Sequence, residues 1–84
     1  MTTGEKIRYF RTSHELTQEQ LASQSGLSIS ALQKYESDER KPKPEQLLKI
    51  SDALGISINI FMDFDIRTVS DLFYFYSEWK NRQI

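Results

Sequence analysis

The sequence predicts an all-α fold, and three observations support this prediction. Apolar residues recur at three- and four-residue steps in several segments, which is the spacing of one buried helix face. Thr2, Thr17 and Thr68 are each followed three residues later by an acidic residue or a glutamine, the spacing of a capping box at a helix start. Gly26 and Gly55 follow two such segments, and glycine is common directly after the last residue of a helix.

Composition and charge limit the possible functions. The chain has 84 residues, no cysteine and one histidine, His14, which argues against disulfides and metal sites. No apolar run approaches the roughly 20 residues of a membrane span, and the first residues do not resemble a signal peptide. We therefore expect an intracellular, cytoplasmic protein without a membrane partner. Because the net charge is −1, any DNA-binding surface must depend on local placement of cations.

The N-terminal half of the chain is predicted to form three short helices. The first is expected to start near Thr2, with Ile7 and Phe10 sharing its buried face. The second is expected to follow Thr17. The third is expected to follow Ser28, whose hydroxyl suits an N-cap.

The next segment is predicted to hold a charged loop and two further helices. Residues 37–44 form the loop, and Pro44 fits the first position of the fourth helix. Ser57 is expected to cap a short fifth helix. The fourth helix is expected to contribute four core residues, which are Leu47, Leu48, Ile50 and Leu54.

The chain is predicted to consist of a domain that spans residues 1–65 and a C-terminal aromatic helix within residues 66–84. Residues 68–84 hold five of the chain's ten aromatic residues, although residues 73–76 (FYFY) also have strand propensity. This segment can fold back onto its own domain or pair with a second copy. We favour pairing, because large apolar surfaces that one small domain cannot cover usually mark interfaces. The expected dimer-interface residues are Leu72, Phe73, Phe75, Tyr76 and Trp79.

Two short helices joined through Gly26 predict a helix-turn-helix unit. In such a unit the first helix crosses above the DNA backbone, and the outer face of the second enters the major groove. Leu32 and Tyr35 lie on one face of the second helix of this pair. The opposite face carries Ile29, Ser30, Gln33 and Lys34.

Two stretches of the chain resemble the phage-repressor and Cro-type helix-turn-helix regulators, also called the XRE family. They are LTQEQLASQSGLSISALQKYE and RKPKPEQLLKISDALGIS, and the resemblance runs from about residue 4 to 62. It implies a five-helix, lambda-repressor-like domain. It also implies that Ile29, Ser30 and Gln33, with Lys34 beside them, read bases, and that Arg11 and Glu36 form a structural ion pair.

The resemblance further implies that Gln18 contacts a DNA phosphate. Some of these residues have an alternative role. Ile29 can instead pack against the domain, and Ser28 can serve only as a helix cap. Lys34 and the loop lysines can be ordinary solvated charges. Two departures from the family pattern are Ser25, where an apolar residue is common, and Asp38 with Glu39, which would repel phosphate if they faced it. The expected phosphate contacts are Thr17, Gln18, Ser28, Arg40, Lys41 and Lys43.

The sequence therefore predicts a sequence-specific, DNA-binding transcriptional regulator. The simplest form is a repressor that binds an inverted-repeat operator in double-stranded DNA as a homodimer. The alternative is a protein-interaction module, such as an antitoxin whose aromatic segment covers a protein partner. The chain has no Gly-rich phosphate loop, His-Glu metal motif or nucleophile–base pairing, so we expect neither an enzyme nor a cofactor.

Overall fold

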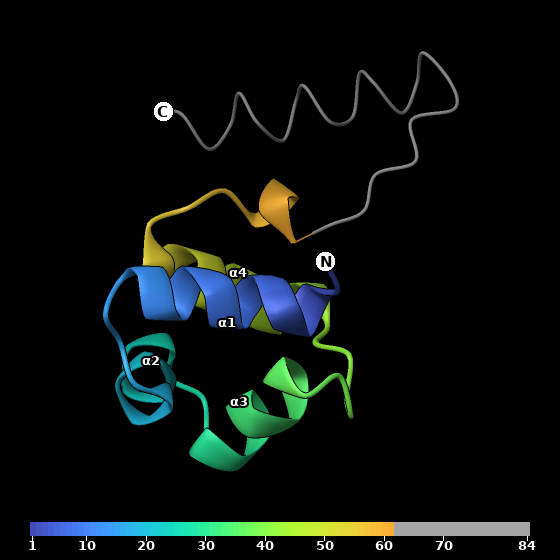
Figure 1. Ribbon diagram of the computed structural model, residues 1–84, viewed down its shortest axis with the longest axis horizontal. Coiled ribbons are helices and arrows are strands. Elements are labelled where there is room, and N and C mark those ends of the chain that lie inside the picture. The colour runs from blue at the N-terminus through green and yellow to red at the C-terminus, as the bar shows by residue number, and fades with distance from the viewer. Residues whose placement is uncertain (62–84) are drawn as a thin grey trace.

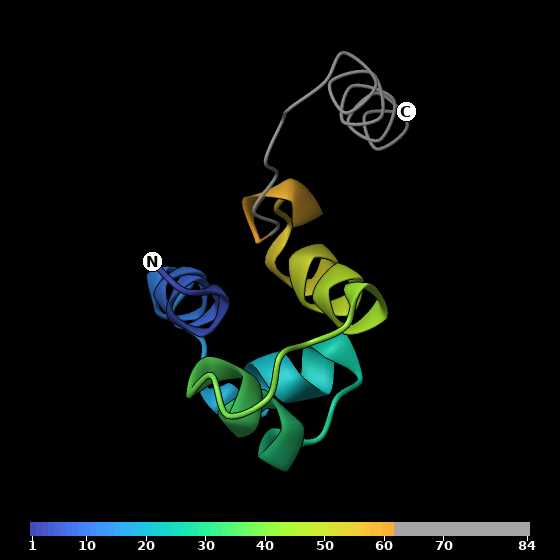
Figure 2. The same cartoon turned by 90° about the vertical axis from the view of Figure 1, so that its right-hand side faces the viewer.

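The structure, a computed structural model, describes residues 1–61, and these form four α-helices and one 3-10 helix without a strand (Figure 1). Figure 2 shows α1 and α4 on opposite sides of the domain, with α2 and α3 below them, and α4 packs mainly against α2. The prediction of an all-helical domain is confirmed for this part of the chain. The elements are α1 (Thr3–Ser13), α2 (Gln18–Ser25), α3 (Ile29–Glu36), α4 (Pro44–Leu54) and η1 (Ile58–Ile60).

The predicted starts of α1 and α2 are confirmed in detail. The Thr2 hydroxyl accepts a hydrogen bond from the backbone N–H of Glu5 at 3.1 Å, and the Glu5 carboxylate accepts one from the N–H of Thr2 at 3.4 Å. Thr17 and Gln20 form the same reciprocal pair at 3.0 and 2.9 Å. Each capping box satisfies two backbone donors that a helix start leaves free, so both helices begin where the sequence predicted.

Within the described residues, the expected short fifth helix is a single 3-10 turn. Only Ile58–Ile60 are helical, and the bonds at this turn span three residues, from the N–H of Ile60 to Ser57 O and from that of Phe61 to Ile58 O. A turn of this kind is a 3-10 helix, which is tighter than an α-helix and occurs in short pieces. The predicted C-terminal aromatic helix, with Leu72, Phe73, Phe75, Tyr76 and Trp79, lies outside the described residues.

One core prediction is wrong. Leu48 is 39% exposed, whereas Leu47 is 6% and Ile50 0% exposed. At about 100° per residue, the buried residues Leu47, Ile50, Ser51 and Leu54 fall within an arc of roughly 100°, and Leu48 lies about 60° outside that arc. Ser51 takes the interior position instead, and its hydroxyl donates to Leu48 O at 3.0 Å. The buried apolar core comprises Ile7, Leu21, Ala22, Leu32, Tyr35, Leu47, Ile50, Leu54, Ile58 and Phe61.

The start of α1 is held directly against the end of α3. A Cβ atom at Gly4 would lie 2.5 Å from the carbonyl oxygen of Tyr35 and 2.6 Å from that of Glu36, so only glycine allows this approach. Asp38 closes the joint, because its carboxylate accepts from the N–H of Gly4 at 3.0 Å and from the Thr2 hydroxyl at 2.6 Å. Its negative charge is therefore used at the start of α1, where the helix dipole favours an anion.

Candidate nucleic-acid interface

A tight turn joins α2 and α3 into one unit. Gly26 ends α2 with a φ of 71°, a conformation that favours glycine, and the N–H of Leu27 donates to Ala22 O at 2.9 Å. Ser28 then caps α3 by accepting from the N–H of Ala31 at 3.1 Å. Only Gly26 to Ser28 separate the helices, and Leu27 packs against the core, so the two helices are held in one relative orientation.

Ser25, at the end of α2, is buried although it is polar. Its hydroxyl donates to Leu21 O at 2.7 Å, within its own helix. Because the hydroxyl has this partner, burial leaves no unsatisfied donor. The departure from an apolar residue at this position therefore does not leave an unpaired polar group under the helix-turn-helix unit.

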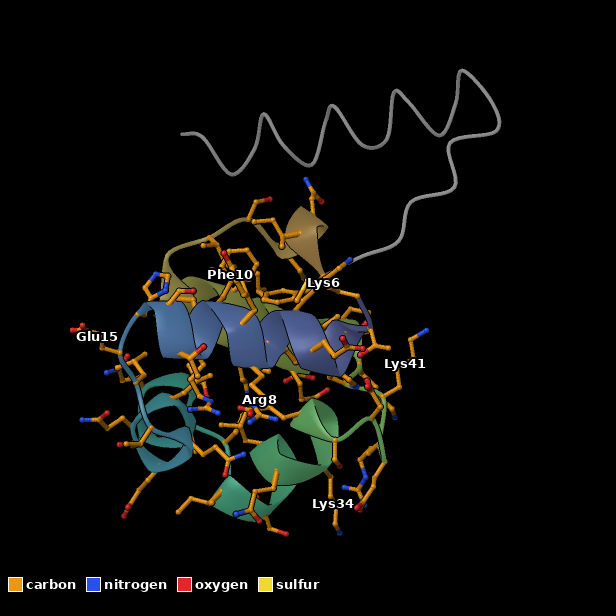
Figure 3. The ribbon with its side chains drawn as sticks, viewed as in Figure 1. Lys6, Arg8, Phe10, Glu15, Lys34 and Lys41 are labelled. Carbon is orange, nitrogen blue, oxygen red and sulfur yellow. The ribbon has the colours of Figure 1, made fainter. Side chains whose placement is uncertain are left out.

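The outer face of α3 carries all four candidate base-reading residues. Ile29, Ser30 and Gln33 are exposed, with Ile29 at 41%, and Lys34 is partly exposed. Figure 3 shows Lys34 pointing away from α1. At about 100° per residue, these four positions fall within an arc of roughly 140°. Leu32 and Tyr35 face the core.

An ion pair ties α1 to the end of α3. The Nε of Arg11 donates to Glu36 Oε2 at 2.8 Å and its Nη2 donates to Oε1 at 2.9 Å, with only 11% and 4% of the two side chains exposed. Arg11 Nη1 also donates to Leu16 O at 2.9 Å. Gln18 joins this network, because its Nε2 donates to Glu36 Oε1 at 3.2 Å. The first residue of α2 is therefore bound to α3 directly, and to α1 through the Glu36–Arg11 pair.

The candidate phosphate contacts lie in three places. Thr17 and Gln18 stand at the start of α2, and Ser28 stands at the start of α3. The hydroxyl oxygens of Thr17 and Ser28 accept helix N–H groups, which leaves each hydroxyl hydrogen able to donate. The exposed loop between α3 and α4 holds the remaining three, which are Arg40, Lys41 and Lys43.

Lys41 and Lys34 do not lie together. Figure 3 shows Lys34 beyond the outer side of α3, whereas Lys41 extends from the edge of the domain, at the height of α1 in that view. Although Lys41 is close to Lys34 in sequence, its side chain does not extend the outer face of α3.

A polar hollow of about 390 Å³ lies where α1, the start of α2 and α3 meet. Arg8 contributes to this hollow, although the sequence patterns did not predict it as a site residue. A signal was present, because Arg8 precedes Arg11 by three residues and residues at this spacing share one side of a helix. The lining residues are Arg8, Arg11, Gln18, Gln33, Glu36 and Ser37.

Comparison with known families decides what this arrangement is. Residues 7–61 match the family model described as helix-turn-helix. The chain belongs to this helix-turn-helix family. The resemblance to phage repressors is confirmed by two relatives. The transcriptional repressor RstR of the cryptic phage CTXphi in Vibrio cholerae is 42% identical over 59 residues. The immunity repressor of Bacillus phage phi105 is 39% identical over 59 residues.

Both alignments cover 70% of this helix-turn-helix chain, but only 53% of RstR and 41% of the phi105 repressor. The chain thus matches about half of each relative or less.

Solved structures show the same helix arrangement. The P22 c2 repressor in complex with a synthetic operator matches with a TM-score of 0.70 and 32% identity, over 77% of this chain and 98% of that one. The restriction-modification controller protein C.AhdI from Aeromonas hydrophila matches with a TM-score of 0.69 and 33% identity, over 71% and 91%. Within residues 1–61, no helix has the length and apolar character needed to cross a membrane.

Proposed function

We propose that this helix-turn-helix protein binds double-stranded DNA at specific sequences and represses transcription. The observation that carries the proposal is the outer face of α3, where exposed side chains of mixed chemistry stand on a helix fixed by α1 and α2. A helix of this kind fits the major groove, where each base pair presents a distinct pattern of donors and acceptors. The family and the names of the repressor relatives support this proposal.

The side chains on this face suit different bases. Lys34 can donate to O6 and N7 of guanine, and Gln33 can pair with the N6 and N7 edge of adenine. Ser30 can donate or accept. Ile29 has no polar side-chain atom, and with 41% of it exposed it can pack on the methyl group of thymine.

Backbone contacts would set the position of α3 in the groove. The Gln18 side chain uses one amide N–H on Glu36, so its second N–H is available to a phosphate oxygen. Thr17 and Ser28 would each add a hydroxyl donor. Arg40, Lys41 and Lys43 would add charge, and each such contact makes binding more sensitive to salt.

We further propose that the regulator acts as a homodimer on an inverted repeat. Two recognition helices related by a two-fold axis can enter successive major grooves about 34 Å apart. The residues proposed for the interface are Leu72, Phe73, Phe75, Tyr76 and Trp79.

Selection of bound fragments from a genomic DNA library, at low and at moderate salt, tests the proposal. An enriched inverted repeat with half-sites about one helical turn apart supports a dimeric, specific regulator. Salt-sensitive binding without an enriched sequence would contradict specificity by this chain alone. Absence of binding at both salt concentrations would contradict the DNA-binding function and favour the protein-interaction alternative.

A further inference from the structure

The hollow between α1, α2 and α3 lies directly beside the proposed base-reading face. Gln33 belongs to that face and Gln18 to the start of α2, and both line the hollow. Its volume of about 390 Å³ is more than ten times the roughly 30 Å³ that one water occupies in the liquid. A charged group and part of its hydration shell therefore fit into the hollow.

The charges around the hollow do not cancel. Arg11 and Glu36 neutralise each other through two hydrogen bonds, and a third N–H of Arg11 is bound to Leu16 O. Arg8 is exposed, and within residues 1–61 its guanidinium has no ion-pair or hydrogen-bond partner. The hollow therefore carries one uncompensated positive charge, and the group that provides it is free to bind an anion.

Arg8 reaches the hollow from a different element than the other candidate contacts. Figure 3 shows it extending from α1 on the side of α2 and α3. Since Gln18 is held by Glu36, the hollow offers one fixed amide and one free guanidinium. These two donors can bind different oxygens of the same anion.

We propose that this hollow binds one backbone phosphate of the DNA, with Arg8 as its principal ligand and Gln18 as a second donor. The inference rests on the proposed function, which supplies the phosphate. Arginine suits this role because its planar group can donate two parallel hydrogen bonds to two phosphate oxygens. Arg8 thereby fixes α1 to the DNA backbone, and it contributes affinity without reading sequence.

The test compares Arg8→Gln with Lys49→Gln. Both variants remove one exposed positive charge, but Lys49 lies on α4, 4.0 Å from Glu45, and does not line the hollow. Dissociation constants are measured over a salt series for the full chain, on the selected operator and on a scrambled duplex. We expect Arg8→Gln to weaken binding to both duplexes on the order of tenfold, and to reduce the slope of log K against log salt by about 1. Lys49→Gln should leave the slope unchanged.

A methylphosphonate scan identifies the ligand. Replacing one phosphate at a time with a neutral methylphosphonate should reveal one position that weakens binding by the wild type but not by Arg8→Gln. Arg8→Lys, which keeps the charge but not the planar group, should retain the salt slope and bind more weakly than the wild type. It also serves as the informative variant if Arg8→Gln folds poorly.

Several results would overturn the proposal. A salt slope for Arg8→Gln equal to that of the wild type would remove Arg8 from the phosphate contacts while leaving the DNA-binding function intact. A loss confined to the operator would make Arg8 a base reader instead. Failure of the wild type to bind either duplex would overturn the proposed function itself, and this inference with it.

Discussion

Arg8 and Arg11 lie one helical turn apart on α1, yet their surroundings give them opposite roles. Arg11 is 11% exposed and bound to the Glu36 carboxylate, whereas Arg8 is exposed with its guanidinium unpaired within residues 1–61. A buried charge that loses its partner costs folding free energy, whereas water readily solvates an exposed charge that has no partner. Arg11 therefore serves stability, and Arg8 is available for a ligand.

The first prediction concerns Arg11. We expect Arg11→Ala to lower the free energy of unfolding by about 3–5 kcal/mol, because it leaves the Glu36 carboxylate, 4% exposed, without its main partner. Thermal and urea unfolding measure this loss. The double variant Arg11→Ala with Glu36→Gln should lose less than the sum of the two single losses. An unchanged melting temperature for Arg11→Ala would show that the pair does not stabilise the domain.

The second prediction concerns the outer face of α3. We expect Ser30→Ala and Lys34→Ala each to weaken operator binding by about 1–3 kcal/mol and to affect a scrambled duplex much less, because contacts to base edges depend on sequence. Competition binding on the two duplexes measures the difference. Ser13→Ala and Lys49→Ala are matched controls on α1 and α4, away from this face. Equal losses on both duplexes would mean that Ser30 and Lys34 contact phosphate.

At the scale of elements, helix ends could be predicted from the sequence because the groups that define them are close in sequence. Thr2 and Thr17 find their capping partners three residues later, and Gly26 ends α2 through its own backbone conformation. Gly4 and Asp38 could not be interpreted in this way, because they are 34 residues apart and meet only in the fold. The hollow was missed for the same reason, since three helices form it.

The third prediction tests this joint between α1 and α3. Alanine normally stabilises a helix interior relative to glycine by roughly 0.5–1 kcal/mol. We expect Gly4→Ala to have the opposite effect and to lower the free energy of unfolding by about 1–3 kcal/mol. The new Cβ would overlap two backbone carbonyl oxygens of α3. Chemical unfolding measures it. Ser23→Ala, an exposed change on α2, should be nearly neutral. A more stable Gly4→Ala variant would show that the joint can open without cost.

At the scale of the whole molecule, charge placement matters more than total charge. The chain carries 11 basic and 12 acidic residues, so its overall field does not attract DNA. Two of the acidic groups near the proposed interface have partners within the fold, since Glu36 pairs with Arg11 and the Asp38 carboxylate accepts hydrogen bonds from Gly4 and Thr2 at the start of α1. Lys34 on α3 and Arg8 in the neighbouring hollow can then attract DNA locally.

The last prediction concerns assembly. A single α3 covers one half-site, and a second recognition helix one helical turn away would multiply specificity, so a dimer fits the proposed function. The aromatic residues of the segment 66–84 supply apolar surface of the kind that dimers bury. We expect Phe73→Ala and Trp79→Ala to shift the protein toward monomer in sedimentation equilibrium and to weaken operator binding, while Tyr9→Ala, on exposed α1 surface, should not. A wild-type monomer at micromolar concentration would contradict the proposed homodimer.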